Sequence, residues 1–193
     1  MLDRMVDVPD PERRYQRLVA ELGREFPRLR IVKKPDSRMH RAIHHFLRIV
    51  TFGGMSSYLD SYQTTIGATI YVTADWDERD PCERYCTLRH EAIHLRQFRR
   101  WTLPGMALLY VLLPLPLGLA YFRARFEMEA YAESIRATAE VYGPDTPRLP
   151  AYRERILAQF TGPAYGWMWP FRGALGRWYD GVLASLPSPR QGT

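Results

Sequence analysis

The stretch "DPCERYCTLRHEAIHLRQ", residues 80–97, sets two histidines four positions apart within a run of helix-forming residues. The Asp-Pro pair that opens it is typical of a helix N-terminus, so the pattern predicts a helix that ends near Arg100. On such a helix His90 and His94 project from one face, about one turn apart. Both imidazoles can then reach a single ion, with Glu91 beside them.

The pattern H-E-x-x-H has a chemical reason as well as a spacing. A zinc ion lowers the pKa of its water toward neutrality and polarises a carbonyl group. A carboxylate beside the ion, here Glu91, can take the proton of that water and pass it to a leaving amine. A second histidine pair, "HRAIH" at residues 40–44, carries arginine in the glutamate position, where a cation would oppose a metal. We therefore place a Zn²⁺ site at His90 and His94.

On His90, Glu91 and His94 the chain resembles the zincin metalloproteases. The resemblance implies zinc as cofactor and a peptide or protein as substrate. It also implies hydrolysis of the peptide bond through a zinc-bound water that Glu91 activates. Two other functions remain open: a non-catalytic zinc-binding scaffold and a membrane-anchored structural protein.

Two imidazoles do not hold zinc firmly, so a third ligand is expected downstream. In the gluzincin branch of the zincins that ligand is a glutamate on a later helix, often in an E-x-x-A-D pattern. "EMEAY", residues 127–131, matches this pattern up to its last letter, so the resemblance places the third ligand at Glu127. Glu129 is the alternative, because the two glutamates point about 200° apart on a helix and only one can face the metal. Tyr131 replaces the aspartate that braces the site in the family.

The rest of the chain predicts an α+β fold that is mainly helical, with a small sheet packed on the helices. The resemblance makes this a zincin-like domain over residues 1–186, followed by a flexible tail at 187–193. Strand signals rich in β-branched and aromatic residues occur in two places, and helical periodicity occurs around them. We expect helices near 10–26, 37–50, 81–100, 123–142, 151–160 and 173–185, and strands near 29–34 and 62–76.

The run "WTLPGMALLYVLLPLPLGLAYF", residues 101–122, has no charge and is long enough to cross a bilayer. A single crossing would put His90 and Glu127 on opposite sides of the membrane, where they could not share an ion. The prolines and glycines within the run also oppose one continuous helix. We therefore predict an apolar helical hairpin that returns the chain to the zinc. It either packs in the soluble core or contacts the membrane surface, with the flanking arginines at the headgroups.

The composition and the N-terminal sequence indicate which classes of partner and which cellular compartment to expect. The formal net charge is +6, but no block of five or more Lys and Arg residues occurs, so we expect no nucleic acid. The N-terminus lacks the apolar segment of a signal peptide, and two cysteines are too few for a disulfide framework. We expect a cytoplasmic protein, either soluble or membrane-associated. In the aromatic stretch "GPAYGWMWPF", Tyr165 and Trp167 are weaker candidates for substrate binding.

Overall fold

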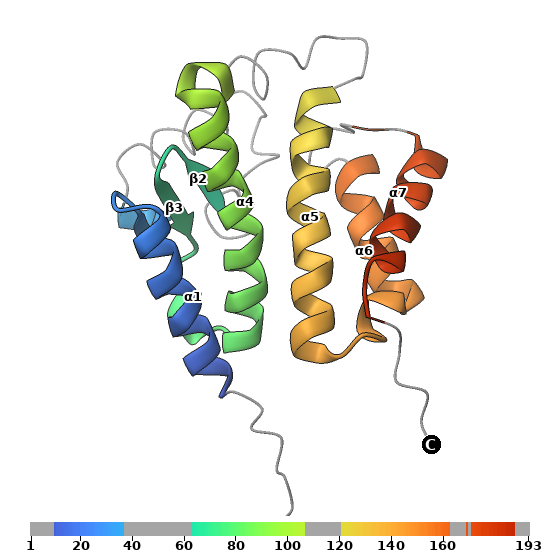
Figure 1. Ribbon diagram of the computed structural model, residues 1–193, viewed down its shortest axis with the longest axis horizontal. Coiled ribbons are helices and arrows are strands. Elements are labelled where there is room, and N and C mark those ends of the chain that lie inside the picture. Colours follow the sequence, from blue (N-terminus) through green and yellow to red (C-terminus); the bar gives the residue numbers. More distant parts are fainter. Residues whose placement is uncertain (1–9, 37–62, 107–120, 163–168, 170, 188–193) are drawn as a thin grey trace, which may run out of the picture.

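Helices and a small mixed sheet make up the described part of the chain, so the predicted α+β class with mainly helical content is confirmed (Figure 1). The computed structural model describes residues 10–36, 63–106, 121–162, 169 and 171–187. The elements in chain order are α1 (Pro11–Glu25), β1 (Arg30–Lys33), the 3₁₀ turn η1 (Lys34–Asp36), β2 (Thr64–Ile66), β3 (Thr69–Val72), η2 (Trp76–Glu78), α4 (Pro81–Met106), α5 (Tyr121–Tyr142), η4 (Thr146–Arg148), α6 (Pro150–Thr161) and α7 (Arg172–Ala184).

The three strands form a sheet in the order β1-β3-β2. β1 runs parallel to β3, and β2 pairs antiparallel with it. A tight turn joins β2 to β3, and Gly67 adopts a φ of 61° there, which glycine tolerates without strain. β2 is therefore an edge strand of the described sheet, and it lies against α4.

Helix α4 begins where its sequence predicts. The carboxylate of Asp80 accepts hydrogen bonds from the backbone N–H groups of Cys82 and Glu83, which caps the helix N-terminus. Its end differs from the prediction at Arg100, because the helical run continues to Met106 across a break at Thr102, where φ is 60°. Pro104 follows the break in a new first turn, where its missing N–H costs no intrahelical bond.

Helices α4 and α5 lie side by side and run in opposite directions (Figure 1). Near the start of α4, the hydroxyl of Tyr85 donates to the carboxylate of Glu140, late in α5. Near the other end, the side chain of Gln97 donates to the backbone carbonyl of Phe126, early in α5. The apolar run therefore starts and finishes at one end of this helix pair, as a hairpin requires.

The interior of the predicted hairpin, residues 107–120, lies outside the described residues, so its packing and membrane contact stay predictions. The run's ends, 101–106 and 121–122, belong to α4 and α5. Among the described helices, none combines the length and apolar character needed to cross a membrane. Also outside the described residues are the predicted helix at 37–50 with His40, His44 and His45, the candidates Tyr165 and Trp167, and all of the predicted tail except Pro187.

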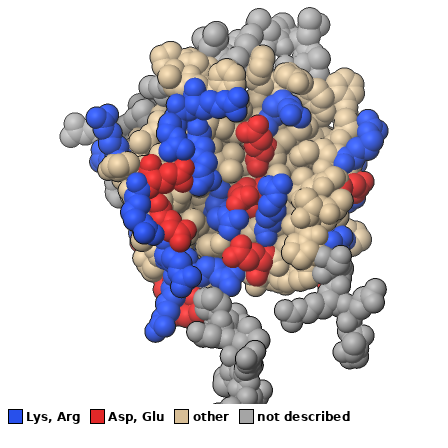
Figure 2. Space-filling view, viewed as in Figure 1, with Lys and Arg blue, Asp and Glu red and all other residues tan. Residues whose placement is uncertain are grey.

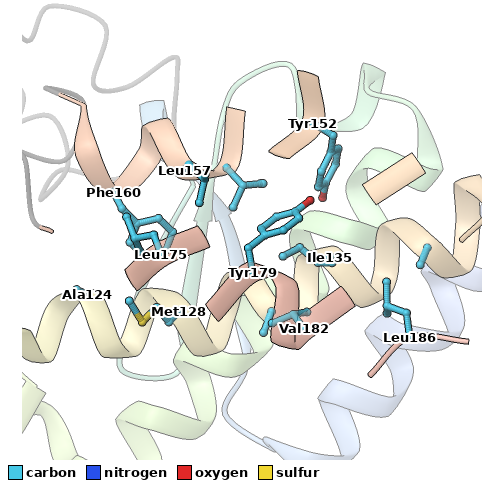
Figure 3. Close-up of a cluster of buried hydrophobic side chains, with 13 residues drawn as sticks. Ala124, Met128, Ile135, Tyr152, Leu157, Phe160, Leu175, Tyr179, Val182 and Leu186 are labelled. Atoms are coloured by element: carbon cyan, nitrogen blue, oxygen red, sulfur yellow. The ribbon is translucent and has the colours of Figure 1, made fainter. Parts of the chain in front are cut away.

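Two hydrophobic clusters meet at α5. One joins α5 to α6 and α7, and Figure 3 shows Ile135, Phe160 and Tyr179 among its buried side chains. The other joins α1, the sheet and α4, and it includes Leu88 and Ala137. Since α5 contributes to both clusters, its position against α4 is fixed from both sides, and with it the position of Glu127.

An ion-pair network also links α4 to α5. Figure 2 shows basic and acidic side chains interleaved over the face that contains α1 and these helices. Arg89 forms ion pairs with Glu133 and Glu140, and its guanidinium also donates to the hydroxyl of Tyr85. Arg14 of α1 pairs with Glu140 as well. The carboxylate of Glu133 is therefore paired with Arg89 in this network.

Candidate metal centre

The two histidines of α4 and one glutamate of α5 converge in the structure. The Nε2 atoms of His90 and His94 are 3.2 Å apart. The carboxylate oxygens of Glu127 lie 3.6 Å from His90 Nε2 and 3.8 Å from His94 Nε2. These three side chains form a group that could hold a metal ion. Residues 37 positions apart in the sequence are thus brought together by the antiparallel pairing of α4 and α5.

The ring of His90 is held by α5. Its Nδ1 lies 3.0 Å from the hydroxyl oxygen of Ser134, and that hydroxyl donates to the backbone carbonyl of Ala130. Because the Ser134 proton is used there, the oxygen accepts from Nδ1–H, which leaves Nε2 with its lone pair. The ring of Tyr131 packs edge-on against His90 with 4.8 Å between centroids. Ser134 thus holds the ring of His90 from α5.

The ring of His94 is held within α4. Its Nδ1 lies 2.9 Å from the amide oxygen of Gln97, and the amide nitrogen donates to the carbonyl of Phe126 and to the carboxylate of Glu129. These two acceptors fix the orientation of the amide, so its oxygen accepts from the Nδ1–H of His94. Glu129, the alternative third ligand, therefore supports the site from outside through Gln97, whereas Glu127 faces the histidines.

This arrangement of donor atoms suits a small cation. The two Nε2 atoms lie 3.2 Å apart with a carboxylate beside them, so positive charge is favoured among them, either as a proton on His94 or as a metal ion that takes its place. A tetrahedral ion with bonds of about 2.0–2.1 Å separates its ligand atoms by roughly 3.3 Å. The observed separations of 3.2, 3.6 and 3.8 Å need only small side-chain adjustments to match. The Glu127 side chain is also only 2% exposed, and positive charge beside a buried carboxylate stabilises it.

Glu91 lies next to the histidines but points to a different partner. Its carboxylate accepts a hydrogen bond of 2.6 Å from the hydroxyl of Thr65, on edge strand β2. Burial raises the pKa of the Glu91 carboxyl above its ordinary value, although His94 and the Thr65 hydroxyl act in the opposite direction. Lys34, which is fully buried, also acts to lower this pKa through its charge. The hydrogen bond from Thr65 thus fixes the carboxyl group of Glu91, and burial increases its affinity for a proton.

The two histidines differ in their affinity for protons. Burial and the positive charge of His94 lower the pKa of His90 well below its ordinary value, so this ring is neutral near pH 7. For His94 burial also acts to lower the pKa, but the carboxylates of Glu127 and Glu91 outweigh it and the net shift is upward. A neutral imidazole with a bare Nε2 is the form that binds a metal.

A cleft of about 620 Å³ opens beside this group. Residues of α4, α5 and α6 line it, and both His90 and Glu91 contribute to its surface. Gln63, directly before β2, lines it as well. His94 and Glu127 are buried behind His90 and Glu91. A molecule in the cleft would therefore meet the metal group from the side of His90, with Glu91 alongside.

The structure brings together the predicted residues His90, Glu91, His94 and Glu127. It adds four that sequence reasoning missed: Thr65, Gln97, Ser134 and Lys34. The sequence pattern could have predicted two of them, because Gln97 follows His94 by one helical turn and Ser134 falls on the helical face of Glu127 and Tyr131. It could not have predicted Thr65 and Lys34, because their approach to Glu91 depends on how the sheet packs against α4.

Replacing Gln97 with methionine should weaken transition-metal binding by about 10- to 100-fold while the chain stays folded. The substitution keeps the length of the side chain but removes the acceptor that orients His94. Competition with a chromogenic chelator measures the affinity, and circular dichroism checks the fold. Gln16→Met, an exposed change on α1, is the matched control and should leave the affinity unaltered. Equal affinities for both variants would show that Gln97 does not orient the ligand.

The group of His90, His94 and Glu127, the residues that hold these side chains in place, and the cleft beside them bear on the function of the chain. No protein-family model, curated protein or solved structure matches the chain, so its chemistry must be inferred from these residues.

Proposed function

We propose that the chain is a zinc-dependent peptidase of the gluzincin-like type. The observation that carries the proposal is the convergence of His90, His94 and Glu127 beside a cleft that Glu91 also lines. Two imidazoles and one carboxylate favour Zn²⁺ over hard ions such as Mg²⁺ or Ca²⁺, which prefer oxygen ligands. Three protein ligands also leave a fourth position for a reactant, as catalytic zinc sites do.

The residues of the chain divide the work. A Zn²⁺ ion held by the three ligands would polarise the scissile carbonyl and lower the pKa of water. Glu91, held by Thr65, takes the proton of the attacking water and delivers it to the leaving nitrogen. The raised pKa of Glu91 favours this role, because a base must hold the proton long enough to hand it on. Ser134 and Gln97 keep the two rings oriented throughout.

A peptide fits the shape of the cleft. Along α4 the lining residues extend from Glu83 to Glu91, a rise of about 12 Å, which matches three or four residues of extended chain at about 3.3 Å each. Edge strand β2 begins directly after Gln63, and among the described residues no strand pairs with its outer side, where an extended chain could add. These features support a peptide or protein substrate over a small metabolite.

Removal and return of the metal test the proposal. Purified protein loaded with Zn²⁺ should cleave members of a random peptide pool, as followed by mass spectrometry. Treatment with 1,10-phenanthroline should abolish cleavage, and added Zn²⁺ should restore it where added Mg²⁺ does not. Protein that binds one zinc per chain but cleaves nothing in the pool would favour the non-catalytic scaffold. Cleavage that survives complete loss of metal would overturn the proposal.

A further inference from the structure

One wall of the cleft carries a cation that the proposed reaction does not use. Helix α6 lines the cleft with Tyr152, Arg155, Ile156 and Gln159, whose spacing places them on one helical face. Arg155 is the basic residue of this face. Its side chain therefore reaches the same space as His90 and Glu91.

Arg155 differs from the charged residues around it. Its neighbours on α6 form ion pairs with α7: Arg153 with Asp180, and Glu154 with Arg172. The other arginine of the cleft, Arg79, is bonded to Asp75 and Glu83. Within the part of the chain that the structure describes, no carboxylate forms an ion pair with Arg155.

The guanidinium of Arg155 nevertheless has a defined position against an aromatic ring. Its central carbon lies 4.8 Å from the centroid of the Tyr152 ring. Tyr152 is buried, and its hydroxyl lies 2.9 Å from the hydroxyl of Thr138 on α5. An arginine stacked on a fixed aromatic ring loses less freedom when its fork of N–H groups binds a carboxylate. The cleft thus presents an oriented donor that has no carboxylate partner among the described residues.

The distance to the metal group can be bounded along α5. Ser134 contacts His90, and Thr138, which contacts Tyr152, is one turn or about 6 Å further along the helix. The contacts from Ser134 to His90 at one end and from Thr138 through Tyr152 to Arg155 at the other add to this rise, so Arg155 lies on the order of 10–15 Å from the metal group. An extended peptide rises by about 3.3 Å per residue, so this span corresponds to roughly three or four residues.

We propose that Arg155 binds a carboxylate of the peptide that occupies the cleft, about three residues from the part of the peptide that lies at the metal group. The carboxylate comes either from the C-terminus of a short peptide or from an Asp or Glu side chain. The inference rests on the proposed function only in taking a peptide as the ligand of the cleft. A bidentate arginine–carboxylate pair gives both affinity and register, so it would fix which bond lies at the metal.

Binding to the full-length Glu91→Gln protein tests this without turnover. Three pools of random hexapeptides are compared on the immobilised, zinc-loaded protein: neutral with an amidated end, neutral with a free C-terminus, and amidated with one glutamate. Mass spectrometry measures the peptides retained. We expect one carboxylate-bearing pool, or both, to be enriched about tenfold or more over the neutral amidated pool. The enriched pool identifies the source of the carboxylate.

The double variant with Arg155→Gln should lose this enrichment, and Arg155→Lys should keep part of it. Arg177→Gln, an exposed change on α7, is the matched control and should keep all of it. Enrichment unchanged by Arg155→Gln, or no preference for a carboxylate, overturns the inference even if wild-type protein cleaves peptides. Enrichment that depends on Arg155 in a protein whose wild-type form never cleaves a peptide sustains the inference and rejects the peptidase.

Discussion

Protein with Glu127 replaced by alanine is expected to lose stoichiometric zinc, with an affinity at least about 100-fold below that of the wild type. The reason is that Glu127 is the proposed third ligand of a three-residue set, and loss of groups that only support ligands already costs about 10- to 100-fold in affinity. Zinc per chain after dialysis, measured by atomic emission spectroscopy, gives the stoichiometry. At a zinc concentration 100 times its dissociation constant, the wild type should gain about 2.7 kcal/mol of unfolding free energy. The variant should gain almost none at that concentration.

Glu129→Ala is the matched control for this experiment. Glu129 accepts a hydrogen bond from Gln97 and does not face the histidines, so its loss should weaken zinc by roughly tenfold at most. Zinc retained by Glu127→Ala, or lost as completely from Glu129→Ala, would reverse the assignment of the third ligand.

The choice between Glu127 and Glu129 shows where sequence reasoning stops. Helical periodicity established that only one of them could face the metal, but the rotation of α5 against α4 decides which one does. That rotation is set by packing on both sides of α5, for example by Ala137 in one cluster and Ile135 in the other. The E-x-x-A pattern selected Glu127 by resemblance, and the structure places Glu127 beside the histidines.

Local signals were sufficient for most elements. Asp80 caps α4 by accepting hydrogen bonds from the backbone N–H groups of Cys82 and Glu83, as its position before Pro81 indicated. The later limit of α4 was missed because the break at Thr102 and the restart before Pro104 depend on a single unusual backbone conformation. Nothing in a local pattern signals that a threonine will adopt a φ of 60°.

The partners of Glu91 depend on contacts between distant segments. Thr65 is one of several threonines in a strand-like stretch, and Lys34 follows a short strand far upstream. Both act on Glu91 only because β2 and η1 are brought to α4 in the folded chain. The motif predicted which residue would be the base, whereas the fold supplies what holds it and what sets its affinity for a proton.

Replacing Glu91, the proposed base, with glutamine should reduce peptide hydrolysis by about 10²- to 10⁴-fold while zinc affinity stays within about threefold of the wild type. Glutamine keeps the shape of Glu91 and can still accept the hydrogen bond from Thr65, but it cannot take a proton from water. Because burial raises the pKa of Glu91, the fold disfavours the charged form, so the neutral amide should keep or raise the temperature of unfolding. The measurements are initial cleavage rates, zinc affinity and a thermal melt on one preparation.

Glu83→Gln is the matched control, because it makes the same chemical change on α4 at a residue that also lines the cleft but lies outside the metal group. Glu83 is exposed and pairs with Arg79, so its loss should change the cleavage rate by no more than about threefold. A fall in rate for Glu91→Gln alone, with zinc retained, would separate catalysis from metal binding and from folding. If Glu91→Gln cleaves peptides as fast as Glu83→Gln, proton transfer does not pass through Glu91 and the H-E-x-x-H interpretation fails at its glutamate. If it loses zinc instead, Glu91 is part of the metal group and the division between ligand and base is wrong.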